Sequence, residues 1–272
     1  MIDGLDAARQ IAEIATLHKV VIPLWIEIDV DHYRTGISAT CSAFDELICF
    51  VDSHAALNLS GLMSYGGASY HCPTTSDVIG LTERHRRALL AAAARAEKAG
   101  LPRPRLSFGS SPAVLHAESL AGIDEVRCGI YIFQDLFQAG IGSCNISDIA
   151  LSVLATVVSH GSGLNRFTID AGGLALSKDR STQGRAFDAG FGLICAMDTG
   201  KPVGDLQVSA VSQELGLVSS RAGRPIDLRA FPVGSRVRVL PNHADMTAAA
   251  HEEYHLLKEG ELCEVWRRTN GW

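Results

Sequence analysis

A histidine and a carboxylate stand two residues apart near the C-terminal end of the chain, at His243 and Asp245. They follow the apolar run 237–240, which predicts a strand. Alternate side chains of an extended segment share a face, so both groups are expected to point the same way. One imidazole nitrogen and one carboxylate oxygen, with positions left open for water or substrate, favour a catalytic divalent-metal site. Because a His-x-Asp pair alone is a weak signal, a surface histidine and aspartate are the alternative.

A second candidate site is the turn after the predicted strand 105–108, which contains Gly109, Ser110 and Ser111. Small residues let the backbone approach an anion closely, and the two hydroxyls add donors, so the turn suits a phosphate dianion. After the predicted strand 125–127, Gly129 allows a second close approach, and the hydroxyl of Tyr131 could reach the same phosphate. The alternative is that this Gly-Ser-Ser-Pro stretch is only a turn.

Two kinds of structure must position these residues. Up to about residue 144, helices and strands alternate, which is typical of parallel α/β structure: helices are predicted over 6–17 and 77–99, and strands over 24–30, 57–63, 105–108 and 125–127. The segment 41–50 is ambiguous, and the arginines of the second helix are predicted to form a solvated face. From residue 145 onward, Gly, Pro and Ser separate runs that predict a mostly antiparallel β domain: 149–158, 166–170, 190–196, 207–211 and 236–240. Domains are therefore expected at 1–144 and 145–272.

Composition excludes several classes of protein. The 272 residues are 47% apolar and 20% charged, which is typical of an ordered soluble protein. A net charge of -6 gives no reason to expect nucleic acid or an anionic membrane as a partner. No apolar run is long enough for a membrane span, and no basic segment predicts a signal peptide. Seven cysteines without a CxxC pair predict reduced thiols in a cytoplasmic protein.

Taken in order, several short stretches resemble the D-threonine aldolase/eukaryotic-type D-serine dehydratase family: 26–29 with 34–36, 60–67, 109–112, 125–131, 170–172 with 177–179, 212–214 and 241–245. The match runs from about residue 5 to 272. The resemblance implies an alanine-racemase-like fold, with the second half of a pyridoxal phosphate (PLP)-binding (β/α)8 barrel followed by a mostly antiparallel β domain. It also implies a PLP- and metal-dependent lyase that acts on a small D-amino acid with a β-hydroxyl group, and a homodimer.

The resemblance also assigns roles to individual residues. Arg34 is expected near the phenolic oxygen of the cofactor, where a fixed cation stabilises a phenolate, and Tyr65 against the pyridine ring. A loop arginine on the surface and an ordinary packing tyrosine are the alternatives. The metal would bind the substrate hydroxyl, either as a leaving group or for deprotonation in retro-aldol cleavage. The family's serine dehydratases usually have a cysteine where Asp245 stands, so the aspartate resembles the aldolase branch; its hard oxygen suits manganese or magnesium, with zinc as a third candidate.

The sequence departs from the family at several positions. Its five lysines are Lys19, Lys98, Lys178, Lys201 and Lys258, and none stands where the family has its Schiff-base lysine. Lys19 precedes a strand, at the wrong mouth of a barrel. We therefore expect that an N-terminal barrel segment is missing and that the chain alone is inactive. Leu215 replaces a common histidine, Cys128 replaces a proline, and Asp31 replaces a glycine with a neutral effect.

Two other functions stay open at this point. The first is that the chain is a non-catalytic remnant or an assembly partner of a full-length paralogue, which the absent lysine indicates. Alternatively, a metal-bound water at His243 and Asp245 performs hydrolysis without PLP, although two protein ligands are few for that chemistry.

Overall fold

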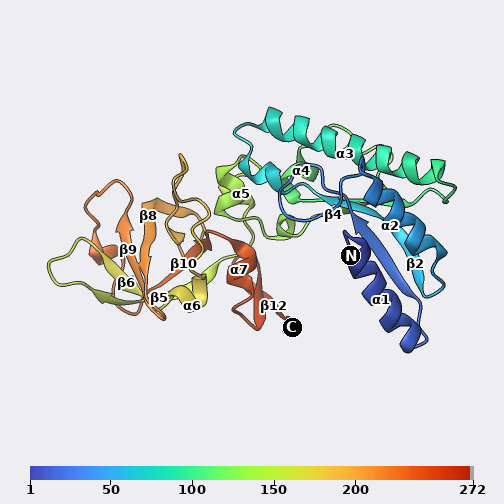
Figure 1. Ribbon diagram of the computed structural model, residues 1–272. Coiled ribbons are helices and arrows are strands. Elements are labelled where there is room, and N and C mark those ends of the chain that lie inside the picture. Colours follow the sequence, from blue (N-terminus) through green and yellow to red (C-terminus); the bar gives the residue numbers. More distant parts are fainter. Residues whose placement is uncertain (270–272) are drawn as a thin grey trace. The chain divides into compact units, whose positions relative to one another are not determined.

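The computed structural model describes residues 1–269, and the chain forms two compact units (Figure 1). The first unit covers 1–129 and the second begins at Ile130. The sequence placed the change of architecture near residue 145, whereas the division of the structure lies between Gly129 and Ile130.

The first unit is a parallel four-stranded sheet in which the strands follow one another in chain order. Its strands are β1 (Ile22–Glu27), β2 (Leu57–Tyr65), β3 (Arg105–Gly109) and β4 (Glu125–Arg127). Its helices are α1 (Leu5–Leu17), α2 (Ser42–Ser53), the short η1 (Gly67–His71), α3 (Thr75–Lys98) and α4 (Ser111–Leu115). Right-handed crossovers that always step in the same direction place the connecting helices on one face, as in a (β/α)8 barrel. The predicted half-barrel fold is confirmed.

The core of this unit lies between the helices and the sheet. The ambiguous segment 41–50 belongs to α2, because Phe44, Leu47, Ile48 and Val51 repeat at helical spacing and are all buried. The predicted solvated arginine face of α3 is wrong in part. Arg95 pairs with Asp45 at 2.6 Å, and Arg86 binds Glu83 and the carbonyl of Ala121.

The opposite face of the sheet is polar near the carboxyl ends of the strands. Because side chains at paired positions of parallel strands share a face, the register aligns them in rows. One row contains Glu27, Met63, Ser107 and Glu125, and the next contains Tyr65, Gly109 and Arg127. In a closed barrel this face would be the interior, where ligand sites lie at the carboxyl ends of the strands.

The second unit is built around a closed antiparallel barrel (Figure 1). Its strand order is β10-β5-β6-β9-β8-β7. Its strands are β5 (Val153–His160), β6 (Phe167–Ile169), β7 (Gly192–Cys195), β8 (Pro202–Val211), β9 (Gly216–Ser220) and β10 (Arg236–Pro241), and a separate hairpin is formed by β11 (Glu253–Lys258) and β12 (Glu261–Arg267). Its helices are η2 (Ile130–Ile132), α5 (Leu136–Gly140), η3 (Ile146–Asp148), α6 (Gly173–Leu176), η4 (Leu228–Ala230) and α7 (Ala244–Ala248). The predicted antiparallel β domain is confirmed, although β9, β11 and β12 were not among the predicted strands. Within residues 1–269, no helix has the length and apolar character that crossing a membrane requires.

Candidate cofactor and metal sites

Arg34 and Tyr65, which the sequence singled out separately, lie in contact at the carboxyl ends of β1 and β2. The guanidinium carbon of Arg34 stands 4.0 Å from the centre of the Tyr65 ring, and its Nη2 lies 3.5 Å from Oε1 of buried Glu27. The Thr35 hydroxyl donates to the other Glu27 oxygen at 2.6 Å. A fixed cation therefore lies over an aromatic face, with a buried carboxylate to orient it.

The loop that carries Arg34 is anchored by Asp31. The Oδ2 atom of Asp31 accepts the backbone N–H of Ala68 at 3.1 Å and lies 3.2 Å from Nε2 of His85 in α3. His85 is only 1% exposed, and burial lowers its pKa even though Asp31 opposes that effect. The expectation that aspartate is neutral at this position misses these contacts, because they come from segments more than 30 residues away in the chain.

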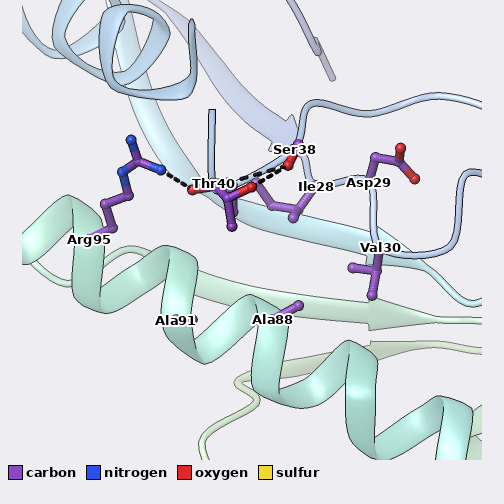
Figure 2. Close-up of a pocket in the computed structure, with 9 residues that line it drawn as sticks. Ile28, Asp29, Val30, Ser38, Thr40, Ala88, Ala91 and Arg95 are labelled. Atoms are coloured by element: carbon purple, nitrogen blue, oxygen red, sulfur yellow. Dashed lines mark hydrogen bonds between the residues drawn. The ribbon is translucent and has the colours of Figure 1, made fainter. Parts of the chain in front are cut away.

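A pocket of about 390 Å³ lies between this loop and α3 (Figure 2). Its lining includes Ile28, Val30, Ala88, Ala91 and Arg95. Ile28 faces the core between helices and sheet, so this pocket opens on the helix side of β1. It is distinct from the polar face of the sheet, to which Glu27 and Tyr65 belong.

Arg127, at the end of β4, was not among the predicted site residues. Its Nη2 donates to the carbonyl of Ser64 at 2.8 Å, and its Nη1 donates to the hydroxyl of Ser107. A Cβ atom at Gly109 would lie 2.9 Å from Nη2, so the glycine provides the space that the guanidinium occupies. Burial lowers the pKa of Arg127 and the nearby Glu125 opposes that effect; an arginine stays charged in either case. Arg127 belongs to a matched stretch, but only the register of the strands reveals these contacts.

The serine turn after β3 has the features of an anion site. Ser110 has a φ of 108°, outside the range that side chains favour, and its hydroxyl caps α4 by accepting the N–H of Ala113 at 3.3 Å. The hydroxyls of Ser110 and Ser69 are 3.0 Å apart. The buried hydroxyl of Ser111 has no hydrogen-bond partner among residues 1–269. A strained backbone beside an unpartnered buried hydroxyl fits a phosphate group.

The two remaining candidates for phosphate binding, Gly129 and Tyr131, make fewer contacts with neighbouring residues. A Cβ at Gly129 would meet no atom within 4 Å, so the protein atoms described here do not themselves require a glycine. Tyr131 belongs to the second unit and is 54% exposed. Gly109, Ser110 and Ser111 thus form one turn between β3 and α4, whereas Tyr131 lies in the second unit.

The lysines of the first unit lie away from this face. Lys19 occupies the turn between α1 and β1, at the amino end of the strand, with a φ of 53°. Lys98 is the last residue of α3. The carboxyl ends of β1, β2 and β4 instead present Arg34, Tyr65 and Arg127. The polar groups thus fit the phosphate and ring of PLP, whereas the first unit supplies no lysine beside them.

The metal candidates His243 and Asp245 converge, but not as the sequence predicted. The segment is not extended throughout: His243 is the N-cap of α7, and Asp245 lies in the first turn of that helix. The Nε2 atom of His243 stands 3.8 Å from Oδ2 of Asp245, while its Nδ1 lies 2.5 Å from Oδ2 of Asp179. The carboxylates of Asp245 and Asp179 raise the pKa of His243 to about 9.

The donor set at this position is small. Within residues 1–269 no group of three or more His, Cys, Asp or Glu side chains is arranged to hold a metal ion. A site of His243 and Asp245 would therefore leave most coordination positions to water or substrate. One nitrogen and one hard oxygen fit a catalytic ion such as Mn²⁺, Mg²⁺ or Zn²⁺, and they do not fit a closed structural zinc site.

Buried polar residues brace this metal box, by which we mean residues 241–245. Asp135, which is fully buried, caps α5 by accepting the N–H of Gln138 at 2.8 Å and also accepts the N–H of Ala244 at 2.9 Å. The amide of buried Asn242 donates to the hydroxyl of Thr182 and to the carbonyl of Gly190, both at 2.7 Å. Burial raises the pKa of Asp135. No sequence signal marked the link from Asp135 to the metal box, because Ala244 lies 109 residues away in the chain.

Comparison with known proteins gives a family match in each of the two units. Residues 1–136 match the family model for the N-terminal domain of alanine racemase, and residues 150–257 match that for a putative serine dehydratase domain. D-threo-3-hydroxyaspartate dehydratase of a Delftia species is 35% identical over the whole chain, which covers 72% of that protein. D-serine dehydratase of Dictyostelium discoideum is 29% identical over 92% of the chain, which covers 64% of that protein.

Solved structures support the same assignment. The structure of D-threo-3-hydroxyaspartate dehydratase from Delftia sp. HT23 superposes with a TM-score of 0.92 and 36% identity, over all of this chain and 72% of the other. A D-threonine aldolase from Filomicrobium marinum, at 20% identity and a TM-score of 0.77, shares the fold. The chain therefore belongs to the family of D-threo-3-hydroxyaspartate dehydratase and D-serine dehydratase, within the alanine-racemase-like, fold-type III PLP proteins.

Proposed function

We propose that this chain is part of a PLP- and divalent-metal-dependent lyase that acts on small D-amino acids with a β-hydroxyl group. The observation that carries the proposal is the alignment of Arg34, Tyr65 and Arg127 with the serine turn at the carboxyl ends of one sheet. Dehydration of a D-serine or 3-hydroxy-D-aspartate type of substrate is favoured, because two of the relatives described above are dehydratases with those names. The homodimer and the cytoplasmic location stay predictions.

The residues of the first unit would divide the binding of the cofactor among them. Ser110 and Ser111, with Gly109 and Gly129, would hold the phosphate; the hydroxyl of Tyr131, a residue of the second unit, stays a prediction of the resemblance. Tyr65 would pack against the pyridine ring, while Arg34 would hold positive charge beside the phenolic oxygen. When bound, PLP supplies an electron sink for the bonds at the substrate α-carbon. Arg127 would keep a second positive charge on the same face of the sheet.

The second unit would contribute the metal. His243 and Asp245 would hold it, with open positions for the substrate hydroxyl. Lewis-acid binding makes a hydroxyl a better leaving group, which suits dehydration. Aldol cleavage is the second candidate reaction. The carboxylate of Asp245 favours it, since the family's serine dehydratases usually have a cysteine at this position.

We further propose that turnover needs a Schiff-base lysine that these 272 residues do not supply. Neither Lys19 nor Lys98 lies at the carboxyl ends of the strands. A non-catalytic role, as a remnant or an assembly partner of a full-length paralogue, is the alternative that this observation motivates.

The test is a PLP titration of the purified chain, followed by borohydride reduction and intact-mass measurement. We expect reversible binding without a covalent adduct, and weaker binding by the Ser110→Ala variant. Ser119→Ala, which changes an exposed loop serine of the same unit, is the matched control and should bind like the unaltered chain. A stoichiometric adduct on one lysine would refute the missing anchor. Absence of any saturable binding would refute the cofactor site.

A further inference from the structure

We propose that Asp179 is a positioning residue of the metal site, which fixes the tautomer and orientation of His243 so that Nε2 faces Asp245. This inference rests on the metal site proposed above. The two ring nitrogens of His243 face different carboxylates: Nδ1 lies 2.5 Å from Oδ2 of Asp179, and Nε2 lies 3.8 Å from Oδ2 of Asp245.

The two distances indicate different roles for the carboxylates. A separation of 2.5 Å is a short, charge-assisted hydrogen bond, so the proton on Nδ1 belongs to the contact with Asp179. A separation of 3.8 Å is too long for a hydrogen bond. Two atoms that each ligate one ion at about 2.1 Å must lie within about 4.2 Å of each other, and the Nε2–Oδ2 pair meets that condition.

Asp179 is itself held in place. Its Oδ1 accepts the hydroxyl of Ser181 at 2.6 Å, and its backbone N–H donates to the hydroxyl of Ser177 at 3.1 Å. Ser177 adopts a φ of 64°, a left-handed conformation that serine rarely takes. The turn thus holds an unfavourable backbone geometry in the segment that presents the carboxylate to His243, which is common where a side chain must be aimed.

The segment that carries Asp179 is also tied to the helix that follows His243. The buried hydroxyl of Thr247 in α7 donates to the carbonyl of Leu176 at the end of α6, at 2.9 Å. Nε2 of His251 lies 3.0 Å from the carbonyl of Ala175. These two bonds and the Asp179–His243 pair bridge the same two segments, so the carboxylate and the imidazole keep their relative position.

This arrangement matters because a neutral imidazole carries its proton on either nitrogen. A carboxylate on Nδ1 favours the Nδ1–H tautomer, which leaves the Nε2 lone pair available, and it makes that nitrogen a stronger ligand. Removing such a partner typically weakens metal binding by about 10–100-fold. Asp179 would therefore raise metal affinity without touching the ion.

The experiment measures Mn²⁺ affinity of the purified full chain by electron paramagnetic resonance, together with the melting temperature. Asp179→Asn should bind Mn²⁺ about 10–100-fold more weakly at an unchanged melting temperature. Asp205→Asn is the matched control: Asp205 also accepts a serine hydroxyl and a backbone N–H in the second unit, and its variant should bind like the unaltered chain. The histidine tautomer, read from the ¹⁵N shifts of His243 in the metal-free protein at a pH above its pKa of about 9, where the ring is neutral, should become mixed in Asp179→Asn but not in Asp205→Asn.

The outcomes separate the two proposals. If the unaltered chain binds no Mn²⁺, the metal site of the proposed function is wrong and the inference with it. If it binds Mn²⁺ and Asp179→Asn binds equally well with the same tautomer, only the positioning role is wrong. Should Asp179→Asn fail to fold, Ser181→Ala decides, because it releases one oxygen of Asp179 without touching His243: weaker binding supports the role, and unchanged binding overturns it.

Discussion

At the scale of single residues, Gly109 links the register of the sheet to the placement of charge. It stands between Tyr65 and Arg127 in one row of side chains, and its missing Cβ leaves room for the guanidinium. Gly109→Ala should displace Arg127 from Ser64 and Ser107, destabilise the first unit by about 1–3 kcal/mol, and weaken PLP binding. Urea unfolding and PLP titration measure the two effects.

The control for that variant is Gly100→Ala, at a position after α3 with open space around it. Its backbone φ of 94° carries a cost of its own, so Gly100→Ala should lose stability but keep PLP affinity. An unchanged PLP affinity in Gly109→Ala as well would contradict the proposed contribution of Arg127.

The raised pKa of His243 predicts how metal binding depends on pH. Asp245 and Asp179 raise that pKa from 6.5 to about 9, so at pH 7 the ring carries an extra proton that a metal must displace. Mn²⁺ affinity should rise about tenfold per pH unit from pH 7 toward 9 and then level off. Isothermal titration at several pH values tests this. If the Mn²⁺ affinity does not change between pH 7 and pH 9, His243 is not a ligand.

Sequence patterns located some of these residues and not others, for a physical reason. The serine turn directly follows the predicted strand 105–108, whereas Arg34 and Tyr65 were assigned by the resemblance of their stretches to a known family. Arg127 and Asp179 act through contacts set by strand register and by a strained turn. Those contacts depend on three-dimensional proximity, which one sequence without relatives does not contain.

At the scale of elements, Asp31 connects the Arg34 loop to η1 and α3. Asp31→Ala would leave the N–H of Ala68 and the Nε2 of fully buried His85 without their partner. A buried polar group without a partner costs about 1–3 kcal/mol, so the first unit should lose stability by that amount. Hydrogen exchange of the loop 29–36 should also become faster.

Asp52→Ala provides the comparison, since Asp52 is an exposed residue of α2 and its loss should change stability by less than about 0.5 kcal/mol. Equal stability of both variants would mean that the Asp31 contacts do not hold the loop. Exchange rates that rise only in Asp31→Ala would assign the loop's order to this one carboxylate.

The elements themselves were predictable where periodicity is strong. Helix α3 and strand β3 agree with prediction within a few residues. In α1 the existence of the helix was predicted, but the buried face consists of Ala8, Ala12 and Ala15 and not of Ile14, which is 56% exposed. Small residues on the buried face allow the backbone of α1 to pack closely, and that tertiary requirement overrides hydrophobicity. The short helix α7 was missed because a five-residue helix has almost no periodic signal.

At the scale of the whole molecule, the two units differ in how their sheets end. The first unit has an open sheet with β1 and β4 as edges, and a single bridge from Ile2 pairs with β1. The second unit closes its sheet into a barrel and so leaves no unpaired edge in that sheet. We expect two unfolding transitions in urea, with β1–β4 exposed at the lower concentration. Hydrogen-exchange mass spectrometry distinguishes them, and one coincident transition for peptides of both units would be evidence against this order.

The barrel also determines when the metal box can form. Asp179 and His243 are 64 residues apart in the chain, and Asp135 and Ala244 are 109 apart. These segments meet only after β10 has paired with β5 and β7, and such long-range closure is slow. We therefore expect Asp179 and Asp135, which support the metal box, to reach His243 and Ala244 only at the end of folding, after the rate-limiting step. A bound ion would leave the folding rate of the second unit unchanged and would act by slowing its unfolding.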